Sequence, residues 1–317
     1  MGGYSQQRRI LLHIGWPKTG TTTLQKHGLN QLDGFRYLGK VPLVYEKNVL
    51  FFDLVHLVAY ASEEKFEEVE ESMFQRLIHL EKELFFEVDP SVPAILSEES
   101  FLSCLLKPSD HQHHGISTAS LSGIIDRLSR IQVRWNVSFD FLITERDPFE
   151  LLHSYYAQAY HIIRHFKGLG TFQGYIAIGT QGLASVDLGF RYLKPGMVTN
   201  SFAARFGRTH VHAIGMDELF SDGKMHLSKW YPDLPDFNLG EDQLENRRAV
   251  SKDTKIAHLR PYWVPRLPFH WRKFLSSVKA MYMVKHAHHK HLEVNIVARP
   301  NDHSRLQGFL LAPGPDV

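Results

Sequence analysis

The chain has 317 residues, of which 43% are hydrophobic, enough to bury the core of one large α/β domain or of two smaller ones. Its 36 Lys and Arg residues nearly balance its 34 Asp and Glu residues, so the net charge of +2 does not point to a nucleic-acid partner. A single cysteine, Cys104, excludes an intramolecular disulfide framework and a cysteine-based zinc cluster, which suits a reducing compartment.

The pattern of apolar residues favours a protein without a membrane anchor. No apolar run approaches the roughly 20 residues that a membrane-spanning helix requires. Arg8 and Arg9 run straight into what reads as the first core strand, so we expect no leader peptide with a positive and then an apolar region. We therefore expect a soluble, cytoplasmic protein.

Short apolar runs alternate with helical patterns along the chain. Buried strands of a parallel sheet are expected at residues 9–15, 93–97, 139–144 and 210–214. Helices are expected at about residues 21–32, 62–86, 148–166 and 216–220. Strands that alternate with helices predict a three-layer α/β/α fold with a central, mostly parallel sheet and right-handed crossovers.

Two regions lack this regular alternation. Residues 167–200 are rich in glycine, and we expect irregular structure there, either a mobile substrate lid or a plain surface excursion. An amphipathic basic helix is expected at 269–290, in a helical region of about 255–295, where it either packs as an ordinary helix or covers the site or an acidic surface. We expect residues 1–317 to form a single domain with a variable acceptor or lid region at about 167–240.

The segment between the first expected strand and helix has the features of a phosphate-binding loop. It reads Gly-Trp-Pro-Lys-Thr-Gly-Thr-Thr-Thr from Gly15 to Thr23, and glycine allows the backbone to curl around an anion at a helix start. Gly15 and Gly20 have the spacing of a Walker A loop, but Thr21 stands where that motif has lysine. The only cation, Lys18, precedes Gly20, which argues against an ATPase or GTPase. The alternative is a threonine-rich helix cap without a ligand.

A second phosphate-binding pattern follows the strand expected at 139–144. Arg146 supplies a permanent charge and a forked set of donors, and Ser154 comes eight residues later. Asp147 and Pro148 suit the cap and first turn of the helix that carries Ser154. Without the first loop, this pattern would indicate only a capped helix after a strand.

The two segments together resemble the sulfotransferases that use 3′-phosphoadenosine-5′-phosphosulfate (PAPS). Residues Pro17 to Thr22 are similar to the family's phosphosulfate-binding loop at the end of the first strand, and Arg146 with Ser154 is similar to its 3′-phosphate motif. The resemblance implies a P-loop-like fold and a cofactor site formed by Pro17, Lys18, Thr19, Gly20, Thr21, Thr22, Thr23, Arg146 and Ser154. In a weaker match at 245–251, Arg247 or Arg248 would close over the 3′-phosphate, unless this is a solvated charge cluster.

Sulfuryl transfer, like phosphoryl transfer, depends mostly on positioning and on charge stabilisation. Lys18 is expected to neutralise the leaving phosphate. For the general base we take Glu98 first and Glu99 second, both after the strand at 93–97, although they could instead cap the next helix. His56 is a third candidate, unless it is an ordinary core histidine.

These features predict a sulfotransferase that moves a sulfuryl group from PAPS to a hydroxyl or amine of a small molecule or glycan. The alternatives are a P-loop kinase or NTPase, and a non-catalytic nucleotide-binding scaffold that has lost its acceptor site. No metal is expected: the histidine-rich segments at 111–114 and 286–291 are read as polar surface rather than as metal ligands.

Overall fold

The structure is a computed structural model that describes residues 8–39, parts of 54–75, and 92–106, 119–164, 166–181, 187–239, 249–251, 254–258 and 293–312. The chain divides into two compact units. The first comprises residues 1–146 and 188–245, and the second comprises 147–187 and 246–317. The single domain expected over 1–317 stays a prediction.

The first unit contains the parallel sheet and most of the described helices. Its elements are β1 (Arg8–Gly15), α1 (Thr21–His27), η1 (Leu29–Gln31), β2 (Arg36–Gly39), β3 (Ala94–Ser97), α4 (Ser100–Ser103), η3 (Cys104–Leu106), α5 (Leu121–Trp135), β4 (Val137–Glu145), η4 (Phe190–Leu193), α8 (Met197–Phe206), η5 (Arg208–His210), β5 (Val211–Gly215), α9 (Met216–Leu219), β6 (Phe220–Ser221), β7 (Lys224–Met225), η6 (Leu227–Lys229) and β8 (Phe237–Asn238).

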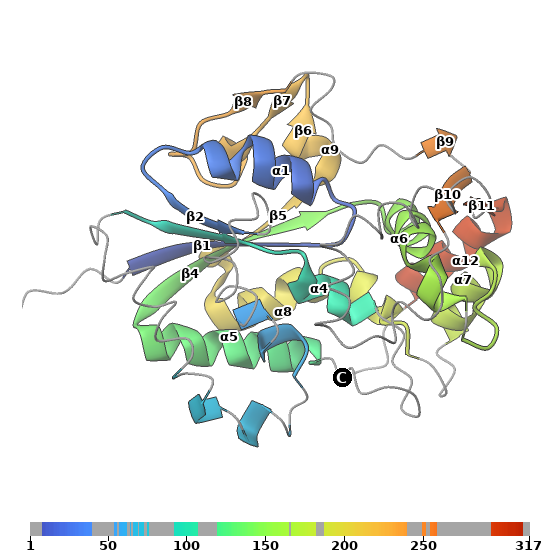
Figure 1. The fold of residues 1–317 in the computed structure, drawn as a ribbon, viewed down its shortest axis with the longest axis horizontal. Coiled ribbons are helices and arrows are strands. Elements are labelled where there is room, and N and C mark those ends of the chain that lie inside the picture. Colours follow the sequence, from blue (N-terminus) through green and yellow to red (C-terminus); the bar gives the residue numbers. More distant parts are fainter. Residues whose placement is uncertain are drawn as a thin grey trace, which may run out of the picture. The chain divides into compact units, whose positions relative to one another are not determined.

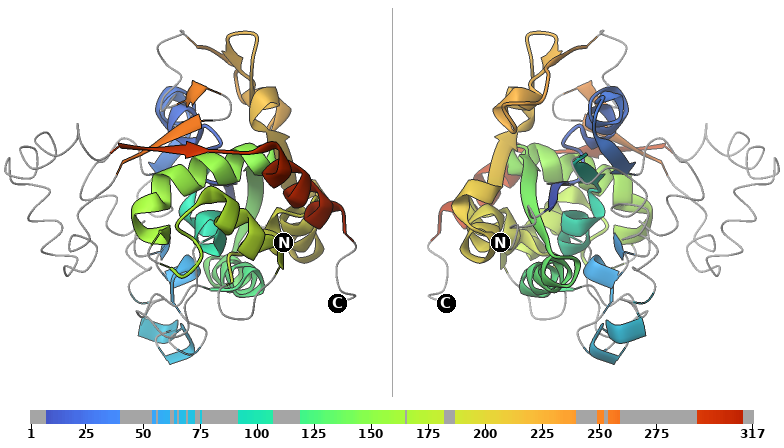
Figure 2. Two further views of the ribbon diagram at one scale, coloured as in Figure 1. Left: turned by 90° about the vertical axis from the view of Figure 1, so that its right-hand side faces the viewer. Right: turned by 90° about the vertical axis from the view of Figure 1, so that its left-hand side faces the viewer.

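The main sheet has five parallel strands in the order β2-β3-β1-β4-β5, so β1 lies at its centre. Helices flank this sheet, and Figures 1 and 2 show α1 and α5 on opposite faces of it. The structure therefore confirms the α/β fold class with a central parallel sheet. All five strands point their carboxyl ends to one edge, which is where ligands bind in folds of this kind.

Each face of the sheet carries its own part of the core. On the face of α1, the strand residues Leu11, Ile95 and Leu142 pack with Leu24 of α1 and with Trp230. The small antiparallel sheet β6-β7-β8 covers this same face through Met225. On the opposite face, the ring of Phe141 lies 5.0 Å from that of Phe202 and 4.6 Å from that of Phe206, both in α8.

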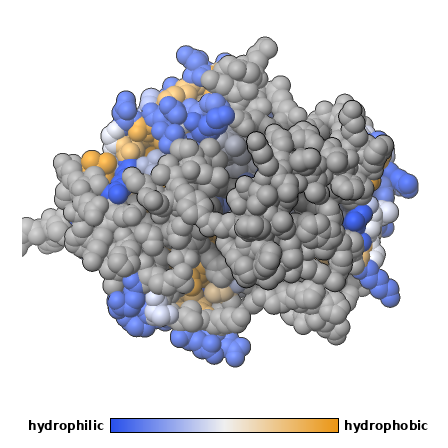
Figure 3. Space-filling model, viewed as in Figure 1, coloured by the Kyte–Doolittle hydropathy of each residue, from blue (hydrophilic) through white to orange (hydrophobic). Residues whose placement is uncertain are grey.

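Helix α5 has a well-defined start and a strongly two-sided character. The Ser120 hydroxyl accepts the Gly123 N–H at its start, and Asn136 adopts a left-handed backbone at its end. Arg127 is buried and donates to the carbonyls of residues 57, 58 and 61. Arg130, one turn on, pairs with Glu70 and Asp126 at the surface. In Figure 3, hydrophilic residues (blue) gather at the lower edge, where Figure 1 places α5 and the segment near residue 70.

The second unit consists of α6 (Pro148–Ile163), α7 (Phe172–Gln181), β9 (Ala249–Ser251), β10 (Thr254–His258), β11 (Glu293–Val297) and α12 (Pro300–Leu311). Strands β11, β10 and β9 form an antiparallel sheet. His153 of α6 is buried, and its Nε2 lies 2.8 Å from the carbonyl oxygen of Ile296. An aromatic cluster that includes Tyr156, Phe172 and Tyr175 joins α6 to α7.

Most expected elements are confirmed, with two differences. The first helix ends at His27 rather than near residue 32, because Gly28 interrupts it before η1 begins. Residues 167–200 are not irregular throughout: they contain α7, η4 and the start of α8. In α7, burial of Phe172, Tyr175 and Ile176 outweighs the low helix propensity of its two glycines.

Two helix predictions extend beyond what the structure describes. Of the helix expected at 62–86, the described residues are helical, at 64, 66–68, 70–72 and 75. The basic helix expected at 269–290 lies outside the described residues.

Candidate functional site

The phosphate loop, defined here as residues 16–20, joins β1 to α1 at the carboxyl edge of the parallel sheet. Lys18 and Gly20 both have left-handed backbone, with φ of 68° and 73°. This conformation costs little for glycine but is uncommon for lysine, and residues held in such conformations cluster at functional sites. The loop is therefore shaped by its surroundings and not by the preference of Lys18.

Close packing around the two glycines fixes where this loop runs. A Cβ atom on Gly15 would collide with the Thr144 hydroxyl of the neighbouring strand β4, and it would lie 3.1 Å from the Thr19 hydroxyl. A Cβ on Gly20 would lie 2.6 Å from the ring of Phe220. Only glycine fits at either position, so the sequence at both ends of the loop is dictated by space as well as by backbone angle.

Hydrogen bonds from strand β4 and from within the loop hold its first turn. The backbone N–H of Trp16 donates to the Thr144 carbonyl at 3.2 Å. The Thr19 hydroxyl donates to the Trp16 carbonyl at 2.7 Å and lies 2.8 Å from the Thr144 hydroxyl. Both backbone polar groups of Trp16 are thus satisfied at the point where the chain leaves the sheet.

Arg146 meets the phosphate loop directly. Its Nη1 donates to the carbonyl oxygen of Lys18 at 3.0 Å, across a separation of 128 residues in the chain. Both side chains are half-buried. The structure therefore brings the Arg146 guanidinium against the backbone of Lys18, the other cation that the sequence assigned to phosphate binding.

The two carboxylates after β3 have different surroundings. Glu98 is 1% exposed, and its Oε1 accepts from both the backbone N–H and the hydroxyl of Ser100, at 2.9 and 2.8 Å. Glu99 is half-buried, and its Oε2 accepts from the Thr21 hydroxyl at 2.7 Å. Glu98 thus closes the turn into α4, whereas the Glu99 carboxylate reaches the start of α1, beside the loop.

The threonines of the loop and of the first turn of α1 differ in exposure. Thr19, Thr21 and Thr23 are buried, while Thr22 is half-buried. Pro17 is buried as well. Hydroxyl groups of the loop are therefore committed partly to protein contacts before any ligand is considered.

Burial sets the charge of several groups near this edge of the sheet. Burial raises the pKa of Glu145, and a hydrogen bond from Thr199 opposes this shift. Burial and the nearby Glu98 charge raise the pKa of Tyr37, so this phenol stays protonated. Burial lowers the pKa of His13 from 6.5 to about 3, so this imidazole is neutral at physiological pH.

The other predicted site residues lie in the second unit or outside the described residues. Ser154 lies on α6 in the second unit, where Asp147 caps the helix by accepting the Glu150 N–H at 2.9 Å. Its role in binding a 3′-phosphate stays a prediction. His56, Arg247 and Arg248 lie outside the described residues, as do the histidine-rich segments 111–114 and 286–291.

Sequence reasoning missed a set of buried polar residues beneath the loop. His13, Ser97 and Thr144 are each 0% exposed, and Gln25 of α1 is 2% exposed. The signal was present in the sequence, because His13, Ser97 and Thr144 each directly follow a run of three apolar residues in their strands. Polar groups in such strands require partners in the interior.

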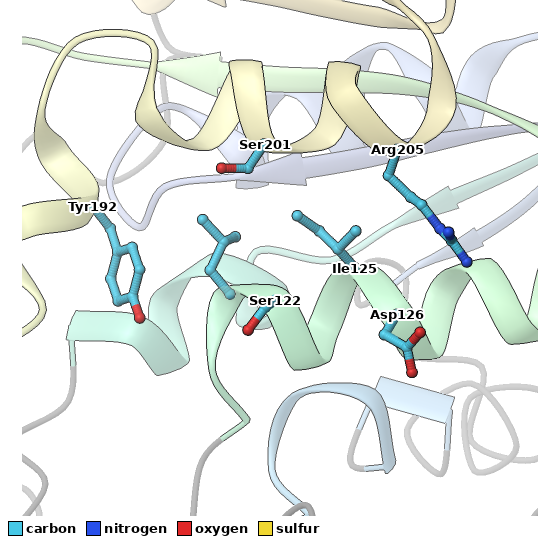
Figure 4. A pocket seen from close by; sticks show the side chains of 7 residues that line it. Ser122, Ile125, Asp126, Tyr192, Ser201 and Arg205 are labelled. Carbon is cyan, nitrogen blue, oxygen red and sulfur yellow. The ribbon is translucent and has the colours of Figure 1, made fainter. Parts of the chain in front are cut away.

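A separate hollow of about 440 Å³ lies between α5, η4 and α8 (Figure 4). Its lining includes Ser122, Asp126, Tyr192 and Arg205, and the Arg205 Nε donates to Ser129 at 2.9 Å. None of its lining residues belongs to the phosphate loop. The hollow is therefore distinct from the candidate site.

No helix in the described part of the chain is both long and apolar enough to cross a membrane. Among those same residues, no three His, Cys, Asp or Glu side chains gather as a metal would require. Comparison of the chain with protein-family models, curated proteins and solved structures found no match.

The packing at Gly15 predicts a large difference between two glycines at the carboxyl ends of parallel strands. Gly15→Ala should lower the free energy of unfolding by about 1–3 kcal/mol, because its methyl group collides with Thr144. Gly215→Ala, at the end of β5, meets nothing within 4 Å and should change stability by about 0.5 kcal/mol or less. Urea unfolding of both variants measures this, and equal stabilities would contradict the described packing.

Proposed function

We propose that this protein is a PAPS-dependent sulfotransferase that acts on a hydroxyl or amine of a small molecule or glycan. The observation that carries the proposal is the hydrogen bond from Arg146 to the Lys18 carbonyl. It supports a common role for two segments that separately resemble sulfotransferase motifs. A strand-loop-helix that merely caps itself would not need two cations at one edge of the sheet.

In the proposed reaction, the acceptor oxygen or nitrogen attacks the sulfur of PAPS while the bond from sulfur to the bridging phosphate oxygen breaks. The products are the sulfated acceptor and 3′-phosphoadenosine-5′-phosphate (PAP). Lys18 stabilises the charge that develops on the leaving phosphate, and loop amides with Thr22 hold that phosphate in line. Arg146 binds the 3′-phosphate and at the same time fixes the loop through the Lys18 carbonyl.

The acceptor must lose a proton during transfer, and the geometry favours Glu99 over Glu98 as its recipient. A general base needs to reach the acceptor, and Glu99 is half-buried beside Thr21, whereas Glu98 is buried and engaged with Ser100. When the cofactor phosphate takes over the Thr21 hydroxyl, one hydrogen bond that holds the Glu99 carboxylate is broken, and the carboxylate can turn toward the acceptor.

A P-loop kinase or NTPase is the second candidate, and the contact between Glu99 and Thr21 favours it to a limited extent, since such enzymes place a carboxylate near the loop to hold Mg²⁺. Thr21 nevertheless occupies the position of the Walker A lysine. The two candidates differ in their ligands. A kinase requires Mg²⁺ and a nucleoside triphosphate, whereas a sulfotransferase recognises a 3′-phosphate.

Nucleotide preference tests the proposed function. Isothermal titration calorimetry without Mg²⁺ should show PAP binding about tenfold to several hundredfold more tightly than AMP, ADP or ATP, because charge-assisted bonds to the 3′-phosphate contribute about 1.5–3 kcal/mol each. Arg146→Ala should remove most of this preference. Arg134→Ala, at an exposed site on α5, is the matched control and should keep it. Equal affinity for PAP and AMP, or a need for Mg²⁺, would contradict the proposal.

Removal of the loop cation should affect turnover and not the fold. Lys18→Ala is expected to slow the formation of PAP from PAPS by about a hundredfold or more. The rate is measured with a pool of hydroxyl and amine acceptors. The free energy of unfolding, measured by thermal denaturation, should change by no more than about 0.5 kcal/mol. Lys26→Ala, at an exposed position in the last turn of α1, should retain the wild-type rate. Near-normal turnover of the Lys18 variant would rule out its assigned role.

Matched substitutions of Glu98 and Glu99 should have different effects on transfer and on stability. Glu99→Gln should lower the transfer rate by about a hundredfold with little change in PAP affinity, because a base acts on the acceptor alone. Glu98→Gln should keep most of the rate and lose stability instead, since its carboxylate accepts both Ser100 bonds. If Glu98→Gln slows transfer and Glu99→Gln does not, the base is Glu98, and the role proposed here for Glu99 is wrong.

A further inference from the structure

Three buried polar side chains form a row under the phosphate loop. His13, Ser97 and Thr144 stand at the carboxyl ends of β1, β3 and β4, with His13 and Ser97 directly opposite each other in the sheet. They share the face of α1, since each lies two residues beyond a core residue of that face. Side chains this deeply buried must satisfy each other's hydrogen-bonding groups.

The direction of every hydrogen bond on the loop side of His13 follows from one carbonyl. A carbonyl oxygen only accepts, so the single hydroxyl hydrogen of Thr19 is committed to the Trp16 carbonyl. The Thr144 hydroxyl must therefore donate to Thr19, across 2.8 Å. Having spent its hydrogen, Thr144 can only accept from His13, so the Nε2 of His13 carries a hydrogen and donates across 3.2 Å.

The other side of His13 is then determined as well. A neutral imidazole has one N–H, so Nδ1 is an acceptor, and the Ser97 hydroxyl donates to it across 2.6 Å. Gln25 of α1 donates to the Ser97 hydroxyl and carbonyl at 3.1 and 3.0 Å. One directed chain of hydrogen bonds thus runs from Gln25 through His13 to the carbonyl of Trp16.

The neutral state of His13 makes this arrangement the one that exists at working pH. Burial lowers its pKa to about 3, whereas the unfolded chain takes up this proton near pH 6.5. The stability that depends on neutral His13 is therefore complete above pH 6.5 and is lost as the pH falls toward 3. Comparisons of variants consequently belong at neutral pH or above.

We infer that His13 is a positioning residue for the phosphate loop: its Nε2–H acts through Thr144 and Thr19 to hold the Trp16 carbonyl. This inference deepens the proposed function, on which its nucleotide readout rests. Thr144 also accepts the Trp16 N–H through its carbonyl, so both ends of this peptide segment are set by one residue of β4. This chain of hydrogen bonds thereby holds the backbone at Trp16, two residues before Lys18 with its left-handed conformation.

A purely structural network and a positioning network make different predictions, because the chain has two halves. The Ser97 half ties α1 to β3, and the Thr144 half ties the loop to β4. A network that only stabilises the core would let the loss of either half affect the loop equally. A positioning network makes the loop depend on the Thr144 half.

The test compares Thr144→Ala, Thr144→Ser and Ser97→Ala at neutral pH. Thr144→Ala loses the hydroxyl and should weaken PAP binding by about tenfold, the equivalent of one preorganised hydrogen bond. Thr144→Ser keeps the hydroxyl while losing the same methyl group, and it should restore most of the affinity. Ser97→Ala should stay within about threefold of wild type although it also breaks a bond to His13. Equal effects of Thr144→Ala and Ser97→Ala would overturn the inference.

A measurement without ligand separates this inference from the proposed function. Amide hydrogen exchange of residues 16–20 should accelerate in Thr144→Ala and remain unchanged in Ser97→Ala, and ¹⁵N NMR should show His13 as the neutral Nε2–H tautomer. Failure of PAP to bind wild-type protein would defeat the proposed function and leave this asymmetry intact. Equal exchange in both variants, or an Nδ1–H tautomer, would defeat the positioning role whatever nucleotide binds.

Discussion

The close approach of β1 and β4 at their carboxyl ends is the constraint on which the candidate site depends. The Thr144 hydroxyl occupies the space that a side chain at Gly15 would need. Because glycine leaves this space open, β1 and β4 stay paired up to the residue before the loop. Thr144 then fixes Trp16, and Arg146, the first residue after β4, reaches the Lys18 carbonyl. The pairing of β1 with β4 therefore determines both the backbone course of the loop and the position of the Arg146 guanidinium beside it.

The candidate site contains the cations Lys18 and Arg146 and the carboxylate of Glu99, and the role proposed for each depends on its surroundings. Lys18 and Arg146 lie where an anionic ligand would meet the sheet edge, and Glu99 is linked to the same loop through Thr21. A polyanionic cofactor would draw on the cations and displace the carboxylate toward an acceptor. This fits a transfer reaction in which the protein contributes positioning and electrostatics, and the cofactor supplies the reactive group.

The sequence predicted the features that depend on local pattern and missed those that depend on contacts between strands. Apolar runs identified β1, β3, β4 and β5, and loop composition identified Lys18 and its neighbours. The bond from Arg146 to the Lys18 carbonyl was not predicted, because nothing local connects residues 128 apart and the resemblance assigned the two residues to different phosphate groups. The roles of Glu98 and Glu99 could not be separated, since adjacent carboxylates differ only in what surrounds them. His13 was overlooked because it lies in an apolar run, where the chain of hydrogen bonds that it joins is invisible.

Amide hydrogen exchange with and without saturating PAP shows whether the loop after β1 is the nucleotide site. PAP should slow exchange at residues 16–22 and around 144–146, with no comparable change at the hollow lined by Tyr192 and Arg205. Protection confined to that hollow, or no protection in the first unit at all, would contradict this assignment of the site.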